Sequence, residues 1–327
     1  MKALVYTAPE TLDWRAVAAP APGPDERLLT VEGVGICGSD MHAFLGHDPR
    51  RPAPLILGHE VTARDADGRR YAVNPLVTCG TCAACARGRD NLCADRQIIS
   101  MPPRAGGFAE RLAMPAANLV TVPDHVGAEA AALAEPIACG WHAARLARDA
   151  LDICPGDACG LVLGGGAIGL GAALALAAQG VAEVTIAEPA AARRAYLAER
   201  CGQKVADPET LPAGFAPDVI IDGVGLAASR ARASALVRPG GVIAHIGLGA
   251  NQGGLDIRRM TLQEITFIGT YTYTAADFRA TTAAMFDGRL GPLDWTEARP
   301  MAEGARAFAD IRAGRVAAPK IILKPDP

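Results

Sequence analysis

Residues 159–180 read CGLVLGGGAIGLGAALALAAQG, and this stretch decides the fold. The apolar run GLVL predicts a short buried strand, and AIGLGAALALAAQ predicts the helix that follows it. The glycines between them fit the pattern G-x-G-x-x-G, which permits a tight turn, close approach of a pyrophosphate and close helix–strand packing. Because the pattern follows a strand and opens a helix, it predicts a dinucleotide-binding βα unit. The expected cofactor contacts are Gly164, Gly166, Ala167, Ile168 and Gly169.

Glu188 ends the next predicted strand, EVTIAE, about 20 residues after the glycines. A carboxylate there can accept hydrogen bonds from a ribose 2′-hydroxyl and would repel a 2′-phosphate, so it favours NAD over NADP. The simpler alternative is a surface acid at a strand end. Arg193 and Arg194 follow closely. Arg193 is a candidate cofactor contact that could receive a phosphate, although both arginines are also typical of a solvated helix.

The rest of the chain suggests two domains, as expected for 327 residues at about 100–200 residues per domain. After Cys159, the strand-like runs EVTIAE, DVIIDGVG, GGVIAHIGLG and EITFIGTYT alternate with helices. This alternation predicts an α/β fold with a doubly wound parallel sheet. Residues 1 to about 135 are rich in glycine, proline and short strand-like runs, which predicts an irregular β-rich domain. The tail ends in the strand-like run KIILKP.

Composition argues against several classes of partner. Half of the residues are hydrophobic and the formal net charge is −3, so no basic surface for nucleic acid or anionic lipid is indicated. The sequence has no signal-peptide pattern and no run of about 18 apolar residues. We therefore expect a cytoplasmic protein, in which clustered cysteines bind metal more often than they form disulfides.

A cluster of cysteines lies in residues 78–93, which read TCGTCAACARGRDNLC. Cys79, Cys82, Cys85 and Cys93 have the spacing C-x2-C-x2-C-x7-C. The corresponding iron–sulfur pattern, C-x2-C-x2-C-x3-C-P, has a shorter last gap and a final proline. Four thiolates leave no open position on a tetrahedral zinc, so the cluster predicts a structural zinc site.

A second set of possible ligands is scattered along the chain. Cys37 lies in ICGSDMH, His59 and Glu60 lie in LGHE, and Glu135 lies in LAEP. Cysteine, histidine and carboxylate are the ligand types of a catalytic zinc with an open position. Each residue also has an ordinary structural alternative, and spacing alone does not join the three segments.

These motifs occur together in one order: ICGSDMH, LGHE, the four cysteines, GGFAE, LAEP, VLGGGAIGLG and KIILKP. In this respect the chain resembles the zinc-dependent medium-chain alcohol dehydrogenases, and in particular the sorbitol (polyol) dehydrogenase branch. The resemblance implies a GroES-like catalytic domain of residues 1–137 and 273–327, with a structural zinc lobe at about 78–95. It also implies a Rossmann NAD-binding domain of residues 138–272, with a catalytic zinc in the cleft between the two.

The resemblance also implies roles for individual residues. Cys37, His59 and Glu135 match the ligands of the catalytic zinc, while Glu60 matches a residue that can exchange onto the metal. Which of the two acids binds directly stays open at this point. Asp40 matches an acid that orients the His59 ring.

Further site residues are carried over in the same way. Ser39 and His42 match a relay that passes the alcohol proton to solvent, and the backbone at Tyr271 is expected to meet the nicotinamide, with Tyr273 also facing the cleft. Cys139 matches a position near the nicotinamide and is interpreted as packing. Gly38 stands where some relatives have a phosphate-binding arginine.

The expected enzyme is an NAD-dependent zinc oxidoreductase that converts a secondary alcohol or polyol to the ketone. It would contain two zinc ions per chain and form a homodimer or homotetramer through the edge of the Rossmann sheet. Alternatives are an enzyme for amino-alcohol, threonine or sugar-phosphate substrates, or a non-catalytic zinc-binding member. Arg50 and Arg51 could meet an anionic substrate group, but we expect them on a solvated loop.

Overall fold

The computed structural model describes residues 1–325, which form two compact units. One unit comprises Met1–Glu135, Thr274–Asp287 and the chain from Leu293 onward, and the other comprises Pro136–Tyr273 with Gly288–Pro292. The division differs from the expected boundaries mainly at Gly288–Pro292, which we had assigned to the catalytic domain. None of the helices within residues 1–325 is long and apolar enough to cross a membrane.

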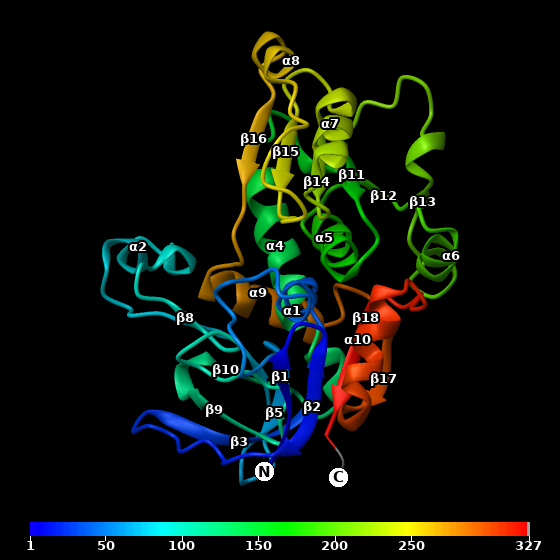
Figure 1. The fold of residues 1–327 in the computed structure, drawn as a ribbon. Coiled ribbons are helices and arrows are strands. Elements are labelled where there is room, and N and C mark those ends of the chain that lie inside the picture. The colour runs from blue at the N-terminus through cyan, green and yellow to red at the C-terminus, as the bar shows by residue number, and fades with distance from the viewer. Residues whose placement is uncertain (326–327) are drawn as a thin grey trace. The chain divides into compact units, whose positions relative to one another are not determined.

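The second unit is built on a six-stranded parallel sheet with the order β13-β12-β11-β14-β15-β16 (Figure 1). Numbered within the unit, this is the order 3-2-1-4-5-6 of the dinucleotide-binding fold. The predicted doubly wound α/β fold is therefore confirmed. The strands are β11 (Cys159–Leu163), β12 (Glu183–Ala187), β13 (Val205–Ala206), β14 (Val219–Asp222), β15 (Val242–His245) and β16 (Thr266–Gly269). The helices are α4 (Ala134–Asp149), α5 (Ala167–Ala178), α6 (Ala191–Glu199), α7 (Ala227–Leu236) and α8 (Ile257–Leu262).

Register places the cofactor loop at the carboxyl edge of this sheet. Leu163, the last residue of β11, pairs with Ala187 on one side and with Asp222 on the other. The glycine-rich turn that follows Leu163 thus lies where the chain order along the sheet reverses, which is the usual ligand-binding point of such sheets. Buried apolar side chains such as Leu161, Ile220 and Ile243 form a core cluster of this unit.

The first unit is β-rich, as predicted, and the C-terminal tail completes it. Its main sheet has the order β10-β6-β5-β3-β18-β17, with β9 also pairing with β3. A three-stranded sheet β2-β1-β4 and the pair β7-β8 accompany it. Strand β18, from the run KIILKP, lies between β3 and β17, so the two ends of the chain share one sheet.

The elements of the first unit are short. Its strands are β1 (Lys2–Ala8), β2 (Thr11–Ala16), β3 (Glu26–Gly35), β4 (Leu55–Ile56), β5 (Glu60–Arg64), β6 (Arg70–Val73), β7 (Leu76–Val77), β8 (Gln97–Ile98), β9 (Arg111–Pro115), β10 (Leu119–Thr121), β17 (Thr296–Pro300) and β18 (Lys320–Lys324). Its helices are α1 (Gly38–Phe44), α2 (Ala83–Ala86), α3 (Ala128–Ala131), α9 (Ala275–Phe286) and α10 (Gly304–Arg312).

Candidate active site and metal centres

Asp40 joins the two segments that carry Cys37 and His59. Cys37 is the N-cap of α1, and its backbone N–H donates to the Asp40 carboxylate at 3.0 Å. The other carboxylate oxygen accepts from the Gly58 amide at 3.2 Å and lies 3.5 Å from Nδ1 of His59. Asp40 is fully buried, and burial acts to raise its pKa. His59, Arg51 and the Cys37 amide together outweigh that effect, so the pKa of Asp40 is lowered and the group stays ionised.

His59 and Glu60 enter the site from the start of β5. Gly58, just before them, has φ +89, and a Cβ there would lie 2.7 Å from the Phe108 ring, so only glycine fits. In β5, Glu60 pairs with Gly35 of β3. A Cβ on Gly35 would lie 1.9 Å from Oε2 of Glu60, so this glycine leaves the space that the carboxylate occupies.

Cys37, His59 and Glu60 form a compact donor group. One ligand atom from each lies within 4.8 Å of the others. His59 and Glu60 are buried, and Oε2 of Glu60 is a buried oxygen without a hydrogen-bond partner. Burial acts to lower the pKa of His59, but Asp40 and Cys37 raise it well above its usual value. The group thus has an excess of negative donors and one unused oxygen, which fits a zinc ion with sulfur, nitrogen and oxygen ligands.

Lys320 is a part of this site that the sequence analysis missed. Its Nζ donates to Oε1 of Glu60 at 2.6 Å and to the Ile36 carbonyl at 2.8 Å. Burial acts to lower the pKa of Lys320, but Glu60, with Cys37 and Glu135, outweighs burial and the pKa is raised. Lys320 therefore remains an ammonium that holds Oε1 of Glu60, while Oε2 has no hydrogen-bond partner.

Glu135 does not belong to the compact donor group, although it was matched to the third ligand. It is 5% exposed in the first turn of α4, near enough to Lys320 to raise its pKa. Ser39 and His42 both lie on α1, one turn apart, so they share a face of the helix. Ser39 is partly buried and His42 is exposed, as an inner and an outer station of a proton relay would be.

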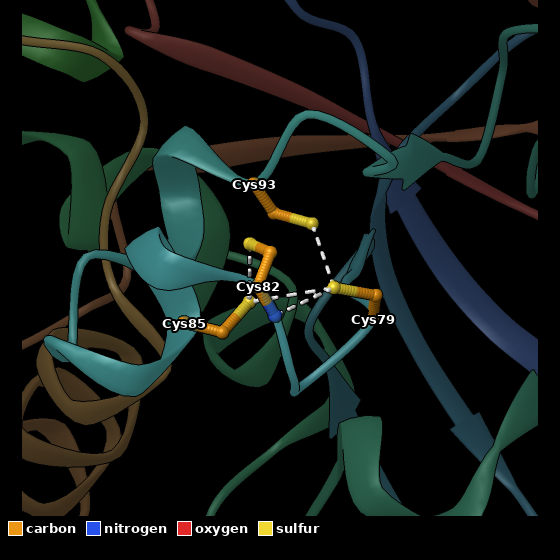
Figure 2. Close-up of side chains that lie close together, drawn as sticks. All are labelled: Cys79, Cys82, Cys85 and Cys93. Carbon is orange, nitrogen blue, oxygen red and sulfur yellow. Dashed lines mark hydrogen bonds between the residues drawn. The ribbon is translucent and has the colours of Figure 1, made fainter.

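The four cysteines of the lobe converge on one point (Figure 2). Sγ of Cys79 lies 4.0 Å from Cys85 and 3.5 Å from Cys93, and Sγ of Cys82 lies 3.6 Å from Cys85. A tetrahedral zinc with Zn–S bonds of about 2.3 Å requires sulfur atoms about 3.8 Å apart. Backbone N–H groups of Thr81 and Cys82 lower the pKa of Cys79 to about 6, which favours the thiolate a metal needs. The spacing and the chemistry both fit a closed zinc site.

The glycine-rich turn of the second unit has the geometry that its pattern predicts. Gly164 has φ +93, and Gly166 is the N-cap of α5, where a Cβ would meet open space. A Cβ on Gly169 would lie 1.8 Å from the Gly164 carbonyl oxygen, so the third glycine allows helix and strand to touch. Ala167 and Ile168 begin the helix, whose N-terminal amide groups suit a phosphate.

Glu188 lies against this turn. Its Oε2 accepts from the Gly165 amide at 2.8 Å and its Oε1 accepts from the Ala190 amide at 2.8 Å. The carboxylate is therefore held at the edge of the phosphate loop, where a ribose would follow.

The arginines after Glu188 differ from the expected solvated pair. Arg194 donates to the Glu188 and Pro189 carbonyls and pairs with Asp207 at 3.0 Å. Arg193 is partly buried, and burial lowers its pKa. Both arginines lie on α6, as expected, but they are only partly exposed.

Two arginines and two tyrosines that the sequence singled out differ in their exposure. Arg51 is 4% exposed and donates to the Ser100 carbonyl and to Asp48, so it is not on a solvated loop. Arg50 is exposed and is also held by Asp48. Tyr273 is 1% exposed and belongs to the core, so it cannot line a cleft, whereas Tyr271 is partly exposed. Arg51 was expected on a solvated loop because the sequence does not show that Asp48 and the Ser100 carbonyl accept its hydrogen bonds inside the unit.

Two families of known proteins match the chain. Residues 23–124 match the alcohol dehydrogenase GroES-like domain, and residues 167–287 match the zinc-binding dehydrogenase family. The chain is 34% identical over 309 residues to L-galactonate-5-dehydrogenase of Escherichia coli (strain K12), covering 89% of this chain and 88% of the relative. It is 33% identical over 299 residues to sorbitol dehydrogenase of Bacillus subtilis (strain 168), covering 84% and 82%. The structure of acetophenone reductase from Geotrichum candidum NBRC 4597 in complex with NAD superimposes with a TM-score of 0.87 at 26% identity, covering 99% and 96%.

Proposed function

The chain belongs to the zinc-dependent medium-chain alcohol dehydrogenase family, and from this we propose that it oxidises a polyol or sugar-acid alcohol to the ketone, with NAD as hydride acceptor. The observation that carries the proposal is the compact group of Cys37, His59 and Glu60. The relatives named sorbitol dehydrogenase and L-galactonate-5-dehydrogenase support the substrate class.

The residues of the first unit would hold the metal and move the proton. Cys37 and His59 would supply sulfur and nitrogen ligands, and Glu60 is the carboxylate that lies in the same compact group. When bound, zinc acts as a Lewis acid on the substrate oxygen and the nicotinamide accepts the hydride. Ser39 accepts the alcohol proton and passes it toward His42, whose exposed imidazole releases it to solvent.

Cofactor choice rests on Glu188. Because the carboxylate is fixed beside the Gly165 amide, it can accept from a ribose 2′-hydroxyl and repels a 2′-phosphate. We infer that NAD is preferred over NADP. The preference is tested by measuring kcat/KM with NAD and with NADP. In a Glu188→Ala variant, the ratio of the two kcat/KM values should be smaller than in the wild type.

We also propose two zinc ions per chain and a homodimer or homotetramer in the cytoplasm. The converging sulfur atoms of the four lobe cysteines, none of which forms a disulfide, support the second zinc. Strand β16 is the edge of its sheet, and Leu248, Ile257 and Leu262 are exposed by 75%, 63% and 72% in the chain leading to it. Such side chains suit a subunit interface, and light scattering measures the oligomer directly.

A substrate screen with NADH absorbance tests the function. The panel should contain sugar alcohols, sugar acids, simple secondary alcohols, amino alcohols and phosphorylated polyols. We expect the highest kcat/KM with a sugar alcohol or sugar acid. Cys37→Ser and His59→Ala should abolish turnover, reduce zinc from two ions to one per chain and leave NAD binding intact. Normal turnover in either variant would show that this group does not hold the catalytic metal.

A further inference from the structure

Ser100 lies between the four-cysteine lobe and the group of Cys37, His59 and Glu60. It follows strand β8, and β8 pairs with β7 to close the segment that contains the lobe. The Ser100 hydroxyl oxygen lies 3.4 Å from Nδ1 of His59. The chain that leaves the lobe thus reaches the imidazole directly.

The backbone of Ser100 is strained. Its φ is +69, in the left-handed region, and the residue is 0% exposed. A residue with a Cβ is less stable there by about 1–2 kcal/mol, whereas glycine adopts this conformation readily. A strained, buried residue at a site indicates that its side chain has a function, and the only side-chain polar group of Ser100 faces His59.

Two acceptors share Nδ1 of His59. Oδ1 of Asp40 lies 3.5 Å away and Oγ of Ser100 lies 3.4 Å away, on different segments of the chain. A single N–H can donate to both in a three-centre bond. An ionised carboxylate can only accept, so the Asp40 contact favours the tautomer with the proton on Nδ1, and the two contacts together restrict rotation of the ring. Nε2 is then left with its lone pair for a metal.

The backbone of Ser100 is held by a hydrogen bond from Arg51. Its carbonyl accepts from Nε of Arg51 at 3.0 Å, and Nη1 of Arg51 pairs with Asp48 at 2.6 Å. Arg51 is 4% exposed, so this bond is shielded from water. The buried arginine therefore keeps the strained turn in the position from which the hydroxyl reaches His59.

We propose that Ser100 is a positioning residue for the His59 imidazole, and that the Arg51–Asp48 pair holds Ser100 in place. The proposal rests on the proposed function, which makes His59 a ligand of the catalytic zinc. It predicts that the hydroxyl contributes to the affinity and geometry of the metal site and not to the stability of the fold.

Two variants separate these roles. Ser100→Ala and Ser100→Gly both remove the hydroxyl, but only glycine also relieves the strain. In both, we expect the dissociation constant of the catalytic metal to rise about tenfold. The visible d–d bands of the cobalt-loaded enzyme should change in both variants. Thermal stability should be unchanged in Ser100→Ala, and higher in Ser100→Gly because glycine relieves the strain. Glu264→Gly is the matched control, because Glu264 has φ +51, is exposed and lies in the other unit. It should leave metal binding unchanged.

The cobalt spectrum is read as a difference against Cys37→Ser, which retains only the lobe metal. A wild-type spectrum identical to that of Cys37→Ser would overturn the proposed function itself. If the wild type shows the additional bands and Ser100→Gly shows the same bands with the same affinity, only the role of Ser100 is refuted. Weak metal binding in Ser100→Ala alone would also refute it, because the effect would then follow strain and not the hydroxyl.

Discussion

Lys320→Met should strongly destabilise the first unit. The substitution keeps an apolar chain of similar length but removes the ammonium that lies 2.6 Å from Oε1 of Glu60. Both side chains are less than 5% exposed, so Glu60 would be left as a buried carboxylate without its counter-charge. Removing one partner of a buried pair typically costs about 3–5 kcal/mol, because the remaining charge is uncompensated. The total stability of a domain is only about 5–15 kcal/mol.

The chain contains a matched control for this experiment. Lys204 pairs with Glu183 at 3.0 Å, but these side chains are 62% and 66% exposed. Lys204→Met should therefore cost no more than about 1 kcal/mol. Guanidinium unfolding measures the loss in free energy of unfolding for each variant. The protein should be free of zinc, because bound zinc would itself compensate the charge of an unpaired Glu60 carboxylate. Adding Glu60→Gln to Lys320→Met should recover much of the loss, because a neutral amide needs no counter-charge.

The pH dependence of the pair has a definite sign. Glu60 raises the pKa of Lys320, so the folded-state pKa lies above the unfolded value of about 10.4. The stabilisation is therefore complete below about pH 10 and is lost as the pH rises through the folded-state pKa. If Lys320→Met costs no more than Lys204→Met, then Glu60 is not held as an ionised partner and the argument is wrong.

Three further predictions concern the relay, the cofactor loop and the lobe. His42→Ala should slow alcohol oxidation near neutral pH and be partly rescued by imidazole buffer; an unchanged pH–rate profile would exclude His42 from the relay. Gly169→Ala should weaken NAD binding by about 10–100-fold with zinc content unchanged, because its Cβ would lie 1.8 Å from the Gly164 carbonyl oxygen. Calorimetric titration measures this, and normal affinity would contradict the tight contact. Chelation should expose residues 78–95 to proteases before turnover falls, since a four-cysteine zinc contributes about 10 kcal/mol to local order. Loss of turnover with the lobe still protected would contradict that order.

The arrangement of strands was predictable because it depends on periodicity. The runs around the glycine pattern have the length and apolar character of buried strands, and the alternation with helices implies a parallel sheet. Strand β13 escaped notice because it has only the two residues Val205–Ala206, which carry no periodic signal. All three members of the compact donor group were predicted to be near the metal, because the motifs around Cys37, His59 and Glu60 resemble those of a known family.

The neighbours of the donor group were not predictable in the same way. Lys320 begins the run KIILK, where a lysine ordinarily marks the solvated end of a strand. Its burial depends on β18 lying between β3 and β17, which no local pattern reports. In the sequence, Arg51 follows Arg50 and resembles a solvated loop residue. In the structure, Asp48 and the Ser100 carbonyl accept its hydrogen bonds inside the unit. Charged side chains are buried only when partners are brought in from distant segments, so their burial is a property of the tertiary structure.

The two candidate metal centres also differ in whether their residues come from one short segment or from distant segments of the chain. The lobe cysteines lie within fifteen residues, so a short segment can assemble their site, and four thiolates then saturate a tetrahedral ion. A catalytic metal instead needs a ligand set that leaves one coordination position open, and surroundings that prevent another protein group from filling that position. The proposed ligands lie at the N-terminal end of α1 and at the start of β5, Asp40 accepts hydrogen bonds from both segments, and Lys320 from β18 holds one Glu60 oxygen. Because these groups come from three separate segments of the chain, the site forms only when the strands that carry them have paired in the first unit. A variant that unfolds the lobe should therefore weaken the catalytic centre only through the turn at Ser100, whereas loss of β18 should abolish it.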